Sequence, residues 1–155
     1  MLTYAFKELK RNNYEQIAGE QFDDIYDLFA EILSLGIAYI LKQGLHRLYI
    51  VQTDEIRTLR GKPSIPQTIK NRTKRDTRLV CEFDTFSENN VFNQILKSCM
   101  LLLLRHSDIS RIRKAKLRRL LLFFKTVDEI SPSSIHWNTL RYNHNTRTYQ
   151  MLHNL

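Results

Sequence analysis

The sequence predicts an α+β fold, with a helical N-terminal part, a small antiparallel β-region at about 47–84 and a helical pair at about 88–125. Apolar residues recur at three- and four-residue steps before residue 42 and again after residue 88, as on one face of a helix. Between these segments, two short runs are rich in β-branched and aromatic residues. At 155 residues, with 43% hydrophobic and 26% charged residues, the chain fits one globular domain.

The first strong helix signal covers about residues 22–42. Its apolar face is formed by Phe22, Ile25, Tyr26, Phe29, Leu33, Ile37 and Ile40. The positive N-terminal end of such a helix favours acidic side chains, which here are Asp23, Asp24 and Asp27. Lys42 and then Gly44 are typical of a helix C-terminus. A shorter helix is predicted before it, over about residues 2–11.

The β-region is predicted from two runs of residues that favour strands. Residues 48–51 are rich in such residues, and residues 78–83 alternate in part between apolar and polar. Pro63 and Pro66 restrict any strand near 60–69 to an edge position, because proline cannot donate a ladder hydrogen bond. Residues 70–77 are polar and basic, and are expected to form a loop or hairpin tip.

The helical pair is predicted from two further apolar stripes. The first has a candidate cap at Ser87, with Asn89 and Asn90 nearby. Its apolar residues are Phe92, Ile95, Leu96, Cys99, Met100 and Leu103. The second comprises Leu117, Leu120, Leu121 and Phe124, and Pro132 ends its helix. In the polar and aromatic tail, residues 148–152 resemble the first turns of an amphipathic helix.

The charge of the chain is strongly positive and uneven. Twenty-four Lys plus Arg against sixteen Asp plus Glu give +8, which favours a polyanionic partner, nucleic acid first. Residues 1–31 are mainly acidic, whereas residues 60–78 and 105–119 are mainly basic. Each basic stretch is either a solvated surface or a contact surface for phosphates or an acidic partner. The candidate binding residues are Arg60, Lys62, Lys70, Arg72, Lys74, Arg75, Arg111, Lys114 and Arg118.

No complete catalytic or metal-binding motif is present. A metal-dependent nuclease needs a carboxylate two residues before a lysine and another acidic residue upstream. Only Glu8 and Lys10 have this spacing, without the upstream acid. The five histidines show no ligand spacing, and four glycines cannot form a phosphate-binding GxxxxGK[ST] loop. The chain is therefore expected to bind rather than catalyse, without a metal or cofactor of its own.

Other features of the sequence indicate a cytoplasmic protein. Cys81 and Cys99 do not make a disulfide framework, and are expected to be reduced thiols. The first residues lack the long apolar run of a signal peptide. The most apolar runs, at 100–104 and 120–124, are five residues each and cannot span a bilayer. We expect no membrane partner. The tail aromatics Trp137, Tyr142 and Tyr149 are expected to pack in a core or interface rather than to stack on bases.

Several local motifs keep their order and spacing over nearly the whole chain. The sequence opens with MLTYAF and continues with Gly36-Ile37 through Gly44-Leu45 to Tyr49. Residues 59–62 read LRGK. Near the end of the sequence, Tyr142-Asn143 and residues 147–149 form a further motif. The most specific piece is CEFDTFSEN at 81–89, which leads into NQILKS at 93–98. Together these motifs resemble the McrC family, a subunit of 5-methylcytosine-dependent restriction systems that works with a GTP-hydrolysing AAA+ partner, McrB.

The resemblance implies a regulatory role for this chain. It covers the family's N-terminal half, which engages the McrB ring, stimulates its nucleotide hydrolysis and couples it to a distal nuclease. The PD-(D/E)xK nuclease domain of the family is expected after residue 155, outside this chain, which is expected to be truncated. GTP and Mg²⁺ are then expected on the partner and on the nuclease domain, and DNA is contacted directly or through the complex. In the matching segment 83–97 we expect structural roles, with Asp84 and Ser87 as caps and Asn93 and Lys97 on the polar side of the helix.

Two alternatives stay open. In the first hypothesis, the chain is a stand-alone basic DNA-binding module. In the second, it is a non-functional remnant of a truncated gene. The remnant hypothesis predicts that the interrupted last helix leaves apolar surface exposed.

Overall fold

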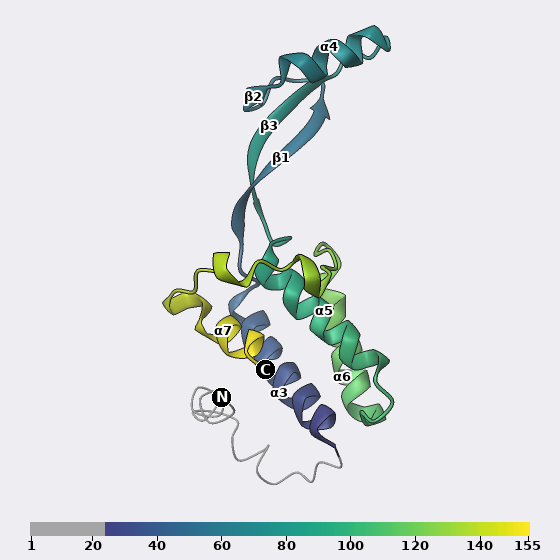
Figure 1. Ribbon diagram of the computed structural model, residues 1–155, viewed down its shortest axis with the longest axis vertical. Coiled ribbons are helices and arrows are strands. Elements are labelled where there is room, and N and C mark those ends of the chain that lie inside the picture. The colour runs from purple at the N-terminus through teal and green to yellow at the C-terminus, as the bar shows by residue number, and fades with distance from the viewer. Residues whose placement is uncertain (1–23) are drawn as a thin grey trace. The chain divides into compact units, whose positions relative to one another are not determined.

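The computed structural model describes residues 24–155 and divides them into two units (Figure 1). The helical unit comprises the described residues up to His46 together with Glu88–Leu155, and the sheet unit comprises Arg47–Ser87. The α+β prediction is confirmed, since helices form the first unit and a three-stranded antiparallel sheet forms the second. The predicted helix at 2–11, and Phe22 and Asp23, lie outside the described residues.

Helix α3 (Ile25–Gln43) lies in the core of the helical unit. The Asp24 side chain accepts a hydrogen bond from the Tyr26 backbone at 3.2 Å, so it caps the helix as its position predicted. Gly44 ends the helix with a φ of 90°, a conformation that favours glycine. The predicted apolar face is confirmed for the buried Leu33, Ile37 and Ile40.

Three more helices complete the helical unit: α5 (Val91–Arg105), α6 (Arg111–Leu121) and α7 (Arg147–His153). The helical pair is confirmed, but the predicted caps Asp84 and Ser87 are wrong. Both belong to strand β3, and Asn90 caps α5 by accepting a hydrogen bond from the Asn93 backbone at 3.3 Å. The strand continues further than the alternation of residues 78–83 indicated, and this moves the cap three positions along the chain.

Helix α7 confirms the helix signal of the tail and packs tightly on α3. Met151 and Leu152 are buried, so the apolar surface expected of an interrupted helix is not found on these side chains. A Cβ added at Gly36 would lie 2.5 Å from Leu152 Cδ2, which is closer than side chains approach in proteins. Gly36 therefore allows α7 to approach α3.

The sheet unit contains β1 (Leu48–Ile56), β2 (Lys62–Pro63), α4 (Ile65–Thr73) and β3 (Leu79–Ser87). The strand order is β1-β3-β2, and β1 pairs with β3 from Leu48 opposite Ser87 to Ile56 opposite Leu79. Pro63 lies in the edge strand β2, as predicted. The loop predicted at 70–77 is wrong for its first part, because α4 extends to Thr73. Pro66 is compatible with this helix because it lies in the first turn, where backbone donors have no helical partner.

Few apolar side chains of the sheet unit are buried. In the described range 47–87, Val80 and Cys81 are its buried apolar residues. Seven large apolar side chains are exposed instead: Leu48, Tyr49, Val51, Leu59, Ile65, Ile69 and Phe86. The sheet unit therefore has no sizeable hydrophobic core of its own and exposes most of its large apolar side chains.

Candidate partner and nucleic-acid interfaces

The sheet unit presents the predicted basic stretch on a turn, a short edge strand and a helix. Arg60 precedes Gly61, whose φ of 67° favours glycine and whose added Cβ would lie 2.3 Å from the Glu82 carbonyl oxygen. This tight turn places the Arg60 guanidinium 4.3 Å from the ring centroid of Phe83, a cation–π contact. Lys62 follows in β2 opposite Glu82.

Helix α4 is attached to the sheet by polar contacts on one side. The Thr68 hydroxyl accepts from the Val80 backbone at 3.1 Å, and Ser64 N–H donates to the Val80 carbonyl at 2.8 Å. Asn71 Nδ2 donates to Glu55 Oε1 at 2.9 Å. Ile65 and Ile69, one turn apart, are 66% and 56% exposed. The helix thus uses polar residues to bind the sheet and leaves two isoleucines uncovered.

The cations around α4 differ in whether they are neutralised. Arg78 is held by Asp76, which accepts from its Nε at 3.0 Å and from its Nη2 at 2.6 Å, and by Glu55 at 2.9 Å. The hydrogen bonds from Arg78 lower the pKa of Asp76 to about 2. No ion pair with a described residue involves the side chains of Lys70, Arg72, Lys74 and Arg75. Arg75 has a φ of 61° in the turn that ends the helix.

A shallow groove lies between β1 and α4. It brings two predicted site residues, Lys70 and Lys74, beside the carboxylates of Asp54 and Glu55. The remaining lining residues are Thr53, Gln67, Asn71 and Val80. These groups are suited to polar and charged contacts.

One exposed apolar pair of the sheet unit was not predicted as a site. Tyr49 and Phe86 lie directly opposite each other on β1 and β3, with ring centroids 5.0 Å apart. Tyr49 is 74% exposed, and Val51, two residues along the same face, is 71% exposed. The signal was present in the β-rich run at 48–51, but a strand pattern does not say whether its apolar face is covered.

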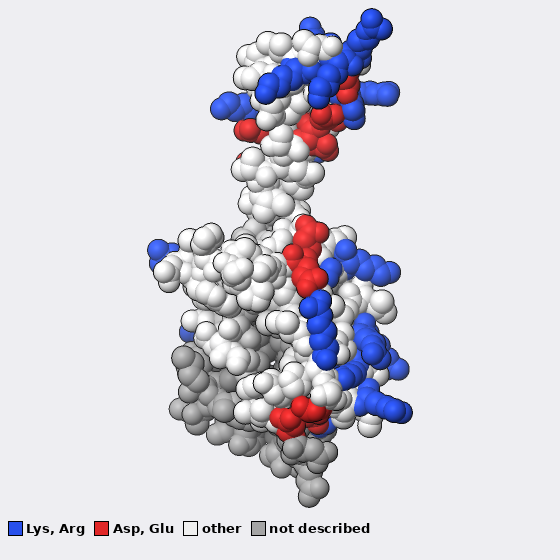
Figure 2. Space-filling model, turned by 45° about the vertical axis from the view of Figure 1, so that its right-hand side comes forward, with Lys and Arg blue, Asp and Glu red and all other residues white. Residues whose placement is uncertain are grey.

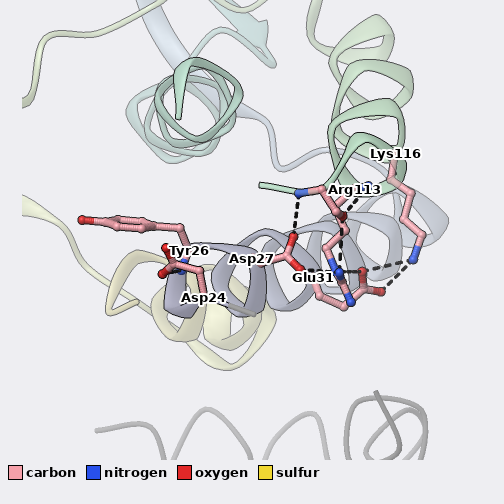
Figure 3. Close-up of polar contacts among 7 residues, drawn as sticks. Asp24, Tyr26, Asp27, Glu31, Arg113 and Lys116 are labelled. Carbon is pink, nitrogen blue, oxygen red and sulfur yellow. Dashed lines mark hydrogen bonds and ion pairs between the residues drawn. The ribbon is translucent and has the colours of Figure 1, made fainter. Parts of the chain in front are cut away.

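The cations of α6 in the helical unit fall into two groups, and the first is neutralised by α3 (Figure 3). Arg113 forms an ion pair with Asp27 through Nη1 and with Glu31 through Nε at 3.1 Å. Lys116 Nζ lies 2.9 Å from Glu31 Oε1. Asp27 also accepts from the Ser110 backbone at 3.0 Å. Sequence reasoning missed this cluster, although carboxylates at i and i+4 beside an apolar stripe are its signal.

The second group on α6 faces outward. Arg111 and Arg118 are exposed and Lys114 is partly exposed, and the described residues offer none of these three an ion-pair partner. Arg119, also exposed, extends the group. Figure 2 shows Lys and Arg side chains gathered along one side of the helical unit. Ile112 and Phe123 are exposed on the same segment.

Asn93 and Lys97, which the sequence placed on the polar side of the apolar stripe, make structural contacts within the helical unit. Asn93 is fully buried, and its Nδ2 donates to the His46 carbonyl at 2.8 Å and to the Glu88 carbonyl at 2.6 Å. Its Oδ1 accepts from the Tyr149 hydroxyl at 2.8 Å. Lys97 Nζ donates to the Val127 carbonyl at 2.5 Å. Both residues satisfy buried backbone groups, as polar residues in a core must.

Of the three tail aromatics, Tyr142 and Tyr149 pack against the helices, as expected. The ring of Phe92 is in edge contact with both, at centroid distances of 5.5 Å and 5.9 Å. The Tyr142 hydroxyl and His153 Nδ1 share a hydrogen bond of 2.8 Å. Burial lowers the pKa of His153 to about 4. Trp137 is half exposed, with its ring 6.5 Å from that of His153.

The remaining chemical candidates concern metals, thiols and membranes. Among residues 24–155 no cluster of three or more His, Cys, Asp and Glu has the arrangement of a metal site. Cys81 and Cys99 are free thiols, and burial raises the pKa of Cys99. No helix within the described range is long and apolar enough to cross a bilayer. Glu8 and Lys10 lie outside the described residues.

Comparison with known proteins supports the resemblance read from the sequence. A family described as "McrBC 5-methylcytosine restriction system component" matches residues 1–155. The "Type IV methyl-directed restriction enzyme EcoKMcrBC" of Escherichia coli (strain K12) is 26% identical over 155 residues, covering 98% of this chain and 44% of the relative. The chain thus spans less than half the length of this relative.

Two solved structures have the same fold. One is the Thermococcus gammatolerans McrBC complex, with a TM-score of 0.65 at 18% identity over 98% of this chain and 44% of that chain. The other contains McrB AAA+ hexamers with bound McrC from the same organism, with a TM-score of 0.65 at 18% identity over 97% of this chain and 34% of that chain. At this identity the likeness concerns the fold.

Proposed function

The chain belongs to the family of McrBC 5-methylcytosine restriction system components, and we propose that it is the N-terminal regulatory part of a McrC-like subunit. In this proposal it docks on a McrB-like AAA+ GTPase, stimulates GTP hydrolysis and couples it to DNA cleavage. GTP with Mg²⁺ binds the partner, and a nuclease domain elsewhere in the system holds the metal for cleavage. This chain binds and regulates, and does not cleave DNA by itself.

The family match over the whole chain supports the restriction-system part of the proposal. The Thermococcus gammatolerans assembly, whose McrB hexamers carry bound McrC, supports a ring-shaped AAA+ protein as the partner. The two proteins differ in more than four-fifths of their aligned residues, so the contact surface must be argued from this chain itself.

We assign docking on the McrB-like partner to the sheet unit, because this unit exposes large apolar side chains that a partner protein could cover. This observation carries the proposal. Ile65 and Ile69 on α4 and the Tyr49–Phe86 pair on the sheet remain uncovered in a unit with two buried apolar residues. Exposed apolar and aromatic patches mark protein–protein contacts, and a few such residues carry most of the binding energy. The cations of α4, which have no ion pair with a described residue, add orientation by charge rather than affinity.

The test measures GTP hydrolysis by the McrB-like partner with and without this chain. We expect the chain to bind the partner and to raise its hydrolysis rate. The double variant Ile65→Asp/Ile69→Asp places charges in the contact and should weaken both effects at least about 10-fold, since losing one buried apolar anchor costs more than 1 kcal/mol.

A matched variant separates docking from general damage. Leu102→Asp/Ile112→Asp changes two exposed apolar residues of the helical unit and should leave stimulation unchanged. Circular dichroism checks that both variants are folded. Equal losses in the two variants would remove the assignment to α4, and a wild-type chain that neither binds nor stimulates the partner would remove the proposal.

Independent DNA binding is the second candidate function, favoured by the cations of α4 and α6 that form no ion pair within residues 24–155. It predicts tight binding to duplex DNA with a steep salt dependence and no effect on GTP hydrolysis. Weak binding of duplex DNA at low salt would count against it.

A further inference from the structure

The outward cations of α6 form a continuous strip, which we define as Arg111, Lys114 and Arg118. At 3.6 residues per turn, these three positions lie within roughly 60° of one another around the helix axis. Arg113, by contrast, is turned toward α3, where its side chain is 12% exposed and bound to two carboxylates. The fold therefore neutralises the inward cation and leaves the strip positive.

Among residues 24–155, no carboxylate forms an ion pair with the strip. Asp108 is the only acidic residue between Arg105 and Lys125. Its carboxylate accepts from the Ser107 hydroxyl at 2.7 Å and lies 3.4 Å from His106 Nδ1. The two α3 carboxylates nearest to α6, those of Asp27 and Glu31, are buried under Arg113 and Lys116. The positive potential of the strip is thus directed to solvent and to a binding partner.

We propose that the strip binds the phosphate backbone of duplex DNA. Arg111 and Arg118 are separated by about 10 Å along the helix axis, and about 10 Å of duplex carries roughly six phosphate charges. Ala115 lies between them, and its small side chain leaves room for a phosphate to approach both guanidinium groups. Such contacts position a protein on DNA without reading the sequence.

The composition of the strip favours DNA over a protein partner. A protein interface has an apolar centre surrounded by polar residues, whereas the strip consists of three cations with the small Ala115 next to them. The exposed Ile112 lies roughly 100° further around the axis at 3.6 residues per turn. The exposed Leu122 and Phe123 follow the end of α6 in a 3-10 turn. The inference rests on the proposed function for the identity of the polyanion, because a restriction subunit works beside DNA.

The experiment measures binding of the 155-residue chain to a fluorescein-labelled duplex, with and without 5-methylcytosine, over a series of salt concentrations. The variant Arg111→Gln/Lys114→Gln/Arg118→Gln removes three phosphate contacts, so the slope of log K against log salt should fall by about 2 to 3. The affinity at moderate salt should fall at least about 10-fold. Both duplexes should lose affinity equally, because backbone contacts carry no sequence information.

The control variant Lys42→Gln/Arg105→Gln/Arg141→Gln removes the same charge from three other exposed positions of the helical unit. Its slope should change by less than about 1. Both variants are checked by thermal unfolding. The inference is overturned if the wild-type chain does not bind the duplex, or if the strip and control variants lose affinity equally.

GTPase stimulation separates this inference from the proposed function. The strip variant should stimulate the McrB-like partner as the wild type does, because docking is assigned to the sheet unit. Loss of stimulation with unchanged DNA binding would make the strip a protein contact and overturn the inference. If the wild type fails to stimulate but the strip variant loses its salt slope, the proposed function fails and the inference is supported.

Discussion

The side chain of Asn93 satisfies several backbone groups at once. It binds the carbonyls of His46 and Glu88, the residues before and after the sheet unit, and it accepts from the Tyr149 hydroxyl. Tyr149 in turn accepts from the His46 backbone at 2.9 Å. Burial raises the pKa of Tyr149 to about 12, so its hydroxyl stays protonated and available as a donor.

Asn93→Ala should therefore be strongly destabilising. The buried Tyr149 hydroxyl would lose its acceptor, whereas the carbonyls of His46 and Glu88 keep donors from Asn90, so we expect the free energy of unfolding to fall by about 1–3 kcal/mol. Chemical denaturation measures it, with the exposed Asn138→Ala as the control, expected within about 0.5 kcal/mol of wild type. A loss below about 1 kcal/mol would mean that the amide is not required.

His153 makes the stability of the helical unit depend on pH. Burial lowers its pKa from 6.5 to about 4, so the unfolded chain binds the proton at a higher pH than the folded chain. The contribution of His153 is complete above pH 6.5 and is lost as the pH falls toward 4. Between pH 7 and pH 5 the loss should be about 2 kcal/mol.

The test compares the pH dependence of unfolding in two histidine variants. His153→Gln should have a shallower decline in stability between pH 7 and pH 5 than the wild type, whatever its stability at neutral pH. His144→Gln changes an exposed histidine and should keep the wild-type decline. Parallel curves for wild type and His153→Gln would contradict the assignment.

At the scale of elements, the contact of α3 with α7 depends on one glycine. Leu152 is almost fully buried, so it cannot move away from a Cβ at Gly36 without disturbing its neighbours. Gly36→Ala should cost about 1–3 kcal/mol through overpacking. In a Leu152→Ala background the same change should cost much less. Thermal unfolding of the four proteins gives the coupling, and an equal cost in both backgrounds would show that the clash does not exist.

Most helices and strands could be predicted from periodicity, but the exceptions share a cause. Helix α4 was not predicted, since 60–69 allowed an edge strand and 70–77 indicated a loop. None of its residues is buried, so no apolar stripe marks it. Strand β1 extends to Ile56 through exposed polar residues that form a strand only because β3 pairs with them. Elements fixed by long-range pairing rather than by their own pattern are not visible in a single sequence.

The positions of the cations in the candidate site could be predicted from the sequence, but their burial and their ion pairs could not. The sequence places cations at steps of three and four on α6, yet it cannot show that α3 neutralises Arg113 and Lys116 and leaves the strip free. Asn93 was expected on the polar side of its helix, and the structure shows that its side chain is fully buried. Roles that depend on a partner more than 40 residues away require the structure.

At the scale of the whole molecule, the helical unit should fold without the sheet unit. Every buried residue of the main core cluster lies outside 47–87. Residues 48 and 87 are paired across β1 and β3, and paired Cα atoms lie about 5 Å apart. A short linker such as Gly-Asn-Gly can therefore join His46 to Glu88, and Asn93 can still bind both carbonyls.

Replacing Arg47–Ser87 by this linker tests the division of labour between the units. We expect a helical protein with one cooperative thermal transition, since its core and polar network are retained. It should not stimulate the McrB-like partner, because the docking side chains of α4 and the sheet are removed. It should still bind duplex DNA with a salt slope that falls when the α6 strip is changed. Stimulation retained by the deletion variant would move docking to the helical unit, and a loss of folding would show that the two units stabilise each other.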